Sequence, residues 1–384
     1  MSSSIKSILV TKLQYHGDVL LMTPVFTLLR EKFPEARIDA LVYKETAPMI
    51  AGDPDINNIY VIDKGWRKLG TVGRLKAEAG LVRALRRNRY DTVIHTTSLP
   101  RGAWLTRLLH PKISVAFRKE GKRSRLFNAC FSITVPTPPW RSHIVSMHLP
   151  LLGPLGIHVS PKEAPGLTMS VPPEAEAEAE KLLSDSGVGK EFILVHPSSR
   201  FTYKCWAFDR MASFIDRLAE KGETVVLTGG PGTEERAQID AIKALLKVAR
   251  PVDLAGKTSS FKSLAALIRR AKLFVGVNSG PAHVAAAFQV PEVVLFGPSL
   301  SRVWHPWKNP RTAIVMTRGK CRCCNQEGCD GNGKSRCMGE IRVEDVLEAA
   351  QGVLSLTPLD FSDNPAVFYP AQFPDLPQRT GFGG

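Results

Sequence analysis

Asp18 is the first residue in the sequence that is placed to move a proton. It follows a nearly continuous apolar run at residues 5–13, which is typical of a strand buried on both faces. An amphipathic helix is predicted after it, over residues 19–33, ending before Pro34. A carboxylate at the start of a helix stays ionised and can accept a proton. Asp18 is therefore a candidate general base, and a simple N-cap is the alternative.

Lys204 and the segment from Asn278 to His283 each lie between a predicted strand and a predicted helix. A lysine at such a turn can neutralise a diphosphate, although most lysines are simply exposed. In Asn278-Ser279-Gly280-Pro281-Ala282-His283, small residues let the backbone approach a ligand, and the first N–H groups of a helix bind phosphate. His283 on the first turn is a candidate contact to the same anion, with a structural histidine as the alternative.

A glycine-rich turn at residues 229–232 is a further candidate nucleotide contact. Glu234 or Glu235, just beyond it, could accept hydrogen bonds from ribose hydroxyls, or could simply favour the positive end of the helix dipole. The turn is not G-x-G-x-x-G, and no Gly-Lys-Ser/Thr follows it. A dinucleotide-binding motif or a P-loop is therefore poorly supported, which weakens a dehydrogenase hypothesis.

Five of the seven cysteines fall within residues 321–337. The spacing of Cys321, Cys324, Cys329 and Cys337 is compatible with four ligands around a structural zinc ion in a reducing compartment. Free or transiently oxidised thiols are the alternative.

An α/β fold must position these residues, because apolar strand patterns alternate with helical ones twice along the chain. The first series predicts a Rossmann-like domain at residues 1–170, ending in a Pro- and Gly-rich linker. The second predicts another at residues 171–357, which includes the cysteine-rich segment 321–337 and a final helix over residues 341–354. Residues 358–384 lack periodicity and are predicted to be a disordered tail.

Length and charge narrow the class of protein. The 384 residues exceed the usual size of a single core, and no apolar run is long enough to span a membrane. The N-terminus is too polar for a signal peptide, so a cytoplasmic protein is expected.

Of the net charge of +15, residues 83–125 carry +10, from twelve Lys or Arg against two acidic residues. Such a field suggests a polyanionic partner such as nucleic acid, an anionic membrane or a phosphorylated glycolipid, with a solvated basic face as the alternative.

Taken in order, these segments resemble the lipopolysaccharide heptosyltransferases of glycosyltransferase family 9, most closely the heptosyltransferase III type. The resemblance covers about residues 5–355. The matching features are the Gly-Asp-Val-Leu-x-x-Thr-Pro turn at residues 17–24, His196-Pro-Ser with Lys204 and Trp206, the glycine-rich turn with its two glutamates, the loop from Asn278 to His283, and the cysteine cluster ending at Cys337. It implies a GT-B fold, with two Rossmann-like domains facing a central cleft, and an inverting transfer of heptose from ADP-heptose to a heptose of the lipopolysaccharide inner core. No cofactor is required in that mechanism.

By position, the resemblance assigns the general base to Asp18 and the diphosphate-binding lysine to Lys204. It assigns the ribose carboxylate to Glu234, with Glu235 as the alternative, and the contacts to diphosphate and heptose to Asn278, Ser279, Gly280 and His283. The family usually has Asp where this chain has Asn278. An amide can keep a sugar contact at that position but cannot carry an ionic role.

The resemblance also implies where the protein works. A lipid-anchored, phosphorylated acceptor predicts peripheral attachment to the anionic inner face of the inner membrane, with Arg118, Lys119, Lys122 and Arg123 as the acceptor or membrane surface. The alternatives are a heptosyltransferase of type I or II, or another glycosyltransferase with a different acceptor. A zinc-containing nucleic-acid-binding protein is more distant, because it leaves the two Rossmann-like halves unexplained; no nucleic-acid partner is expected.

Overall fold

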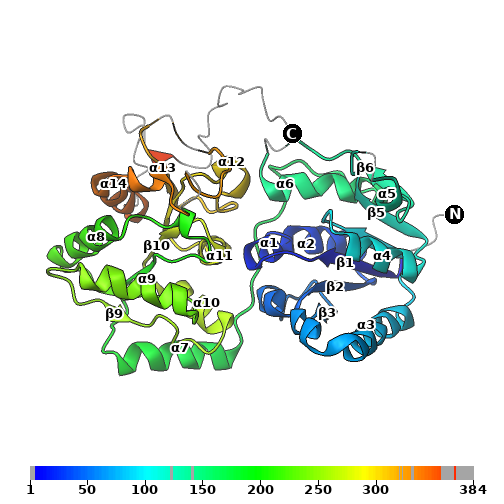
Figure 1. The fold of residues 1–384 in the computed structure, drawn as a ribbon, viewed down its shortest axis with the longest axis horizontal. Coiled ribbons are helices and arrows are strands. Elements are labelled where there is room, and N and C mark those ends of the chain that lie inside the picture. The colour runs from blue at the N-terminus through cyan, green and yellow to red at the C-terminus, as the bar shows by residue number, and fades with distance from the viewer. Residues whose placement is uncertain are drawn as a thin grey trace. The chain divides into compact units, whose positions relative to one another are not determined.

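A computed structural model of the chain describes residues 5–121, 124–139, 142–319, 321, 323–329, 333–355 and 367–368. The chain divides into two compact units, described separately below. Unit 1 is Met1–Glu176 with Ser260–Ala265, and unit 2 is Ala177–Ser259 with Ala266–Gly384. Each is built around one sheet with helices on both faces (Figure 1).

The sheet of unit 1 has six parallel strands in the order β3-β2-β1-β4-β5-β6. Its strands are β1 Ser7–Lys12, β2 Arg37–Tyr43, β3 Asn58–Ile62, β4 Thr92–His95, β5 Ile113–Phe117 and β6 Ile133–Val135. Every residue of β1 is buried, as its apolar run predicts. The strand order reverses between β1 and β4, and ligands of doubly wound folds bind beyond the carboxyl ends of the strands at such a reversal.

The helices of unit 1 connect these strands. They are α1 His16–Leu20, α2 Thr23–Lys32, η1 Lys44–Met49, η2 Lys64–Lys68, α3 Gly70–Arg87, α4 Pro100–Leu109, α5 Ser124–Asn128, α6 Ile144–His148 and η3 Leu149–Leu155. Because parallel crossovers are right-handed, the connections running from β3 toward β6 cover the opposite face to those running from β1 to β3. Helices α3, α4 and α5 therefore share one face, and Figure 1 shows them in succession along one side of unit 1.

The single helix predicted for residues 19–33 is interrupted, so the prediction of one continuous helix was wrong. Helix α1 ends at Leu20 and α2 begins at Thr23. Pro24 has no N–H to donate to the carbonyl of Leu20, and the Thr23 hydroxyl donates to that carbonyl instead, at 2.9 Å. Asp18 consequently lies in a short helix of its own.

Unit 2 repeats the arrangement. Six parallel strands lie in the order β12-β11-β10-β7-β8-β9, and β13 adds to the edge in antiparallel fashion. The strands are β7 Ile193–His196, β8 Val225–Leu227, β9 Val252–Asp253, β10 Leu273–Val277, β11 Glu292–Leu295, β12 Thr312–Val315 and β13 Val367–Phe368. The pairing of Val367–Phe368 with β12 departs from the unstructured tail expected after residue 357.

The helices of unit 2 are α7 Pro173–Asp185 (whose first turn begins in unit 1), η4 Thr202–Lys204, α8 Phe208–Glu220, α9 Thr233–Ala244, α10 Phe261–Arg270 (whose first half belongs to unit 1), α11 Gly280–Ala287, α12 Ser301–Trp304, α13 Arg336–Gly339 and α14 Val343–Leu354. Beneath α8, α9 and α14, an apolar cluster of strand residues such as Val195, Val275 and Leu295 packs against Phe214 of α8 and Val346 of α14. Among the described residues, no helix is long and apolar enough to cross a membrane.

Candidate active site

Asp18 lies in the first turn of α1, directly beyond the carboxyl end of β1 and beside the reversal of strand order. Strand β1 delivers the chain to this edge because its run of apolar residues is buried between helices on both faces. The side chain of Asp18 is 12% exposed. The carboxylate is thus near the surface at the edge where a ligand is expected.

The buried Lys12 forms an ion pair with this carboxylate. The Lys12 Nζ lies 3.9 Å from Asp18 Oδ1 and 3.1 Å from His148 Nε2, and the Lys12 side chain is 3% exposed. Burial lowers the pKa of Lys12 from its ordinary 10.5 to about 8, and the negative charge of Asp18 opposes that shift. Near neutral pH, Lys12 is therefore largely protonated and its charge faces Asp18.

His148, at the end of α6, completes this group. Burial, and then the charge of Lys12, hold the pKa of His148 well below its usual range, so the imidazole is neutral. A neutral Nε2 can accept a hydrogen bond from the Lys12 ammonium. Neither residue is among the candidates predicted from the sequence. A lysine inside the apolar run at residues 5–13 is a signal that could have identified Lys12, whereas nothing local marks His148.

In unit 2, Lys204 and the segment from Asn278 to His283 follow neighbouring strands, β7 and β10, on either side of the reversal of strand order. Lys204 ends η4, with its Nζ 5.2 Å from the ring centre of Phe201. Asn278 is buried, and Ser279 precedes the first turn of α11. The structure thus brings these predicted residues to one edge of the second sheet, as their positions after parallel strands predicted.

Electrostatics and burial connect Lys204 to the α11 loop. His283 is 4% exposed, and burial, followed by the charges of His305 and Lys204, lowers its pKa to about 3. His283 is therefore neutral. Among the described residues, Ser279 Oγ and His283 Nδ1 are buried without a hydrogen-bond partner. Buried polar atoms are nearly always satisfied, so these two indicate a place where a polar ligand completes the hydrogen bonding.

The two glutamates of the β8–α9 turn occupy different environments. Glu235 Oε2 accepts hydrogen bonds from the Gly230 N–H and from the Ser198 hydroxyl, each at 2.8 Å. A Cβ on Gly230 would lie 2.6 Å from Glu235 Oε1, so only glycine permits this close approach. Glu234 is exposed on the same first turn. Glu235 thus closes the turn, and Glu234 takes no part in that contact.

The cysteine-rich segment packs onto the loops that carry the candidate donor site. The Cys323 N–H donates to the carbonyl of Gly297 at 3.0 Å, and the Thr202 hydroxyl of η4 donates to the carbonyl of Gly333 at 3.0 Å. The Trp206 indole donates to the carbonyl of Ile341 at 3.1 Å. This segment therefore supports the turn on which Lys204 lies.

The described residues give no support to the zinc site suggested by the spacing of Cys321, Cys324, Cys329 and Cys337. These cysteines are free thiols, and among the described residues no three His, Cys, Asp or Glu side chains form a group that could hold a metal ion. Cys337 is buried, which raises the pKa of its thiol to about 12. The nearby Cys321, Cys324 and Cys329 contribute to the same upward shift.

The predicted basic surface is described in part. Arg118 and Lys119 are exposed just after β5, and Lys119 Nζ lies 5.6 Å from the ring centre of Phe127. Lys122 and Arg123 lie outside the described residues.

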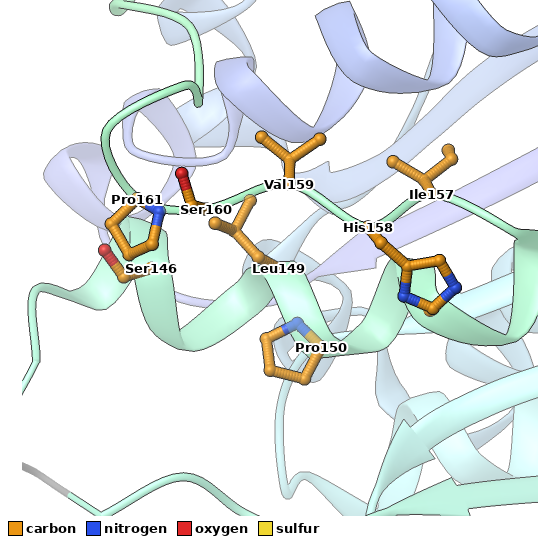
Figure 2. A pocket seen from close by; sticks show the side chains of 9 residues that line it. Ser146, Leu149, Pro150, Ile157, His158, Val159, Ser160 and Pro161 are labelled. Atoms are coloured by element: carbon orange, nitrogen blue, oxygen red, sulfur yellow. The ribbon is translucent and has the colours of Figure 1, made fainter.

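A pocket in unit 1 contains none of the predicted site residues. It lies between α6–η3 and the segment that follows them, and is lined by Ser146, Leu149, Pro150, Gly153, Ile157, His158, Val159, Ser160 and Pro161 (Figure 2). Its lining is mostly apolar, with His158 as its one ionisable side chain. This lining offers no carboxylate, lysine or arginine that could accept a proton or bind a diphosphate.

Comparison with known proteins identifies the family behind this geometry. Residues 79–332 match the model of glycosyltransferase family 9 (heptosyltransferase). The chain is 35% identical over 343 residues to lipopolysaccharide heptosyltransferase 3 of Escherichia coli K12, covering 89% of this chain and 96% of that protein.

Solved structures agree on the fold. A family 9 glycosyl transferase from Veillonella parvula superposes with a TM-score of 0.79 at 24% identity, covering 92% of this chain and 98% of that one. The E. coli heptosyltransferase WaaC, solved with ADP, superposes with a TM-score of 0.66 at 19% identity, covering 90% and 99%. The predicted α/β architecture of two Rossmann-like halves and the predicted family resemblance are both confirmed.

Proposed function

Because this chain belongs to glycosyltransferase family 9 (heptosyltransferase), we propose that it moves heptose from ADP-heptose to a heptose of the lipopolysaccharide inner core, as a heptosyltransferase of type III. One observation supports the proposal that ADP-heptose is the donor. The first turn of α11 presents backbone N–H groups, an unpartnered Ser279 hydroxyl, an unpartnered His283 Nδ1 and the nearby Lys204 charge at one edge of the sheet. A diphosphate is the ligand that this combination fits best.

The donor residues then have distinct roles. Lys204 and the N–H groups at the start of α11 hold the diphosphate, whose negative charge grows as ADP leaves. Ser279 Oγ donates to a phosphate oxygen, and His283, kept neutral by burial, donates through Nδ1 without adding charge. Asn278 offers its amide to the heptose. Glu234 accepts from the ribose hydroxyls, since Glu235 is already engaged by Gly230 and Ser198.

Asp18 is the general base on the acceptor side. It removes the proton from an acceptor heptose hydroxyl while that oxygen attacks the anomeric carbon, and the bond from that carbon to the ADP oxygen breaks on the opposite side with inversion. The Lys12 ammonium favours the ionised carboxylate before reaction, so Asp18 is ready to accept the proton. The neutral His148 holds Lys12 in place without competing for the proton.

The same proposal places the protein at the inner face of the inner membrane as a peripheral protein. The acceptor is anchored in lipid, and the exposed Arg118 and Lys119 add to a strongly basic region of unit 1.

One assay tests the proposal. The full-length protein is incubated with ADP-heptose and with core glycolipids that lack the side-branch heptose, and both ADP release and the mass of the glycolipid are followed. ADP release coupled to a mass gain of one heptose supports the proposal. Transfer only to glycolipids truncated before the first or second core heptose would reassign the enzyme to type I or II. Absence of transfer from ADP-heptose to every core acceptor would overturn it.

A further inference from the structure

Exposed large apolar side chains are concentrated on one helical layer of unit 1. Leu126 on α5 is 77% exposed, Val72 on α3 is 67% exposed and Trp104 on α4 is 60% exposed. Leu75 and Leu108 belong to the same layer. Single exposed apolar residues are common, but a group of this size on adjoining helices marks an interaction site.

The outer surface of each helix explains how these side chains come together. Residues 70–80 of α3 include no buried position; Val72 lies opposite the buried Leu81 on the helix, and Leu75, one turn along from Val72, is 63% exposed. On α4, Trp104 and Leu108 are one turn apart, while Ala103 packs inward against Phe127 of α5. Helices α3 and α4 adjoin through the ion pair of Arg101 with Glu78. We define Val72, Leu75, Trp104, Leu108 and Leu126 as the apolar face.

The surroundings of the apolar face are strongly basic. Residues 70–128 contain fourteen Lys or Arg and only three acidic residues. Two of the acidic residues, Glu78 and Asp91, are paired with Arg101 and Lys112. Exposed basic side chains lie between or beside the apolar ones, namely Lys76, Arg83, Arg107, Lys119 and Arg125. Aromatic and aliphatic side chains interleaved with cations match the boundary between headgroups and acyl chains of an anionic bilayer.

The position of the apolar face in the fold fits a lipid-anchored acceptor. Helices α3, α4 and α5 all begin at the carboxyl edge of the parallel sheet, because each leaves the end of a strand. Asp18 lies at that same edge, after β1. Val72, Leu75 and Leu126 lie near the starts of their helices, hence toward the edge that holds the proposed base.

We propose that the apolar face inserts into the anionic leaflet, so that the protein is held by apolar burial as well as by charge. The choice of a membrane as partner rests on the proposed function, whose acceptor is embedded in lipid. Aliphatic side chains such as Val72 and Leu126 favour a bilayer over nucleic acid, which would use the cations but not these residues.

The test is co-sedimentation of the full-length protein with vesicles of phosphatidylglycerol and phosphatidylethanolamine, and with neutral phosphatidylcholine vesicles. The test variant combines Trp104→Ser and Leu126→Ser. The matched control combines Leu245→Ser and Val248→Ser, which are 46% and 53% exposed in unit 2. We expect the test variant to lower partitioning into anionic vesicles about tenfold or more, because each side chain loses apolar burial. The control should stay within about twofold of the wild type, and neutral vesicles should bind weakly.

Three further measurements separate membrane insertion from misfolding and from attraction by charge alone. The thermal midpoints of both variants should match the wild type, since all four side chains are exposed; if the double variant is unstable, Leu126→Ser alone serves. At about 0.5 M salt, where charge is largely screened, the wild type should keep residual vesicle binding that the test variant lacks. Trp104 should also shift its fluorescence to shorter wavelength with anionic vesicles, and Trp104→Phe should abolish that shift.

Several results would overturn the inference. These are unchanged vesicle binding by the test variant, an equal loss in the control, tighter retention by DNA or RNA than by anionic vesicles, or a solution dimer that the test variant dissociates without lipid. Activity on a soluble, delipidated acceptor separates this inference from the proposed function. If the protein transfers heptose but does not bind vesicles, only the membrane inference is refuted. If it binds vesicles through the apolar face but transfers no heptose, only the proposed function is refuted.

Discussion

The proposed acceptor-side and donor-side regions hold charge by different means. In unit 1, the Asp18 carboxylate is backed by a buried side-chain cation, Lys12, which in turn contacts the neutral His148. In unit 2, the α11 loop offers backbone N–H groups and neutral side chains, with Lys204 as the nearby cation. The proposed base must gain and lose a proton within each cycle. Its partner, Lys12, is a charged side chain that favours the ionised carboxylate. A diphosphate takes no proton in the proposed reaction, and fixed dipoles together with Lys204 can stabilise the charge that grows on it as ADP leaves.

The largest effect should come from removing the base. In Asp18→Asn the amide keeps the shape of the side chain but cannot take a proton, so kcat should fall about 10²- to 10⁴-fold. ADP affinity, measured by calorimetry, should be nearly unchanged, because Asp18 belongs to the acceptor side. Retention of more than half the wild-type rate would remove Asp18 from this role.

A smaller but combined effect is expected at Lys204. Replacing it with Ala should raise the KM for ADP-heptose and lower kcat together, with kcat/KM falling about 10- to 100-fold, because a charge-assisted contact strengthens as ADP leaves. Steady-state kinetics with both substrates varied would show this pattern. A change confined to the KM for the acceptor would assign Lys204 to the acceptor side and contradict the proposed division between the two regions.

Lys12→Met tests whether the buried cation acts on Asp18. Since a neighbouring cation favours an ionised carboxylate, the acid limb of the pH–kcat/KM profile should move to higher pH in this variant. Folded Lys12 has a pKa of about 8 against 10.5 in the unfolded chain, so between these pH values the unfolded state binds more protons and wild-type stability rises with pH.

Denaturation at a series of pH values should show that rise for the wild type and a flatter curve for Lys12→Met. The exposed Lys32→Met at the end of α2 is the matched control and should change neither profile. An acid limb that stays in place would mean that Lys12 serves packing alone.

The smallest effect should distinguish the two glutamates. Glu234→Gln should weaken ADP binding about three- to tenfold, the usual worth of one hydrogen bond, and leave the thermal midpoint unchanged. Glu235→Gln should lower the midpoint, since it disturbs the contacts to Gly230 and Ser198. The opposite assignment of effects would transfer the ribose contact to Glu235.

Much of the site could be predicted because it follows strands. Asp18, Lys204 and the Asn278–His283 loop each come after an apolar run, and parallel strands bring their carboxyl ends to one edge of a sheet. No such rule links Lys12 to His148, which lie 136 positions apart and meet only in the folded unit. The distinction between Glu234 and Glu235 likewise required the turn geometry around Gly230.

One prediction was wrong for a local physical reason, and one suggestion found no support in the structure. The break between α1 and α2 depends on a hydroxyl of Thr23 replacing a missing amide proton of Pro24, which hydrophobic periodicity does not register. The cysteine spacing suggested a metal, yet spacing alone does not determine whether side chains adopt a metal-binding geometry, and no such group is found among the described residues. In the structure, the backbone of the cysteine-rich segment forms hydrogen bonds to η4 and to the loop after β11, and these bonds support the turn that carries Lys204.

The bond from the Trp206 indole to the carbonyl of Ile341 has a consequence for how this protein can be divided. The family model ends at residue 332 and starts at residue 79, so it includes neither Ile341 nor Asp18. A fragment cut at those limits would strand a buried indole without its acceptor and would lack the proposed base. The stretch matched by the family model is therefore not expected to fold and act by itself, and a fragment for expression should extend at least from Asp18 to Ile341.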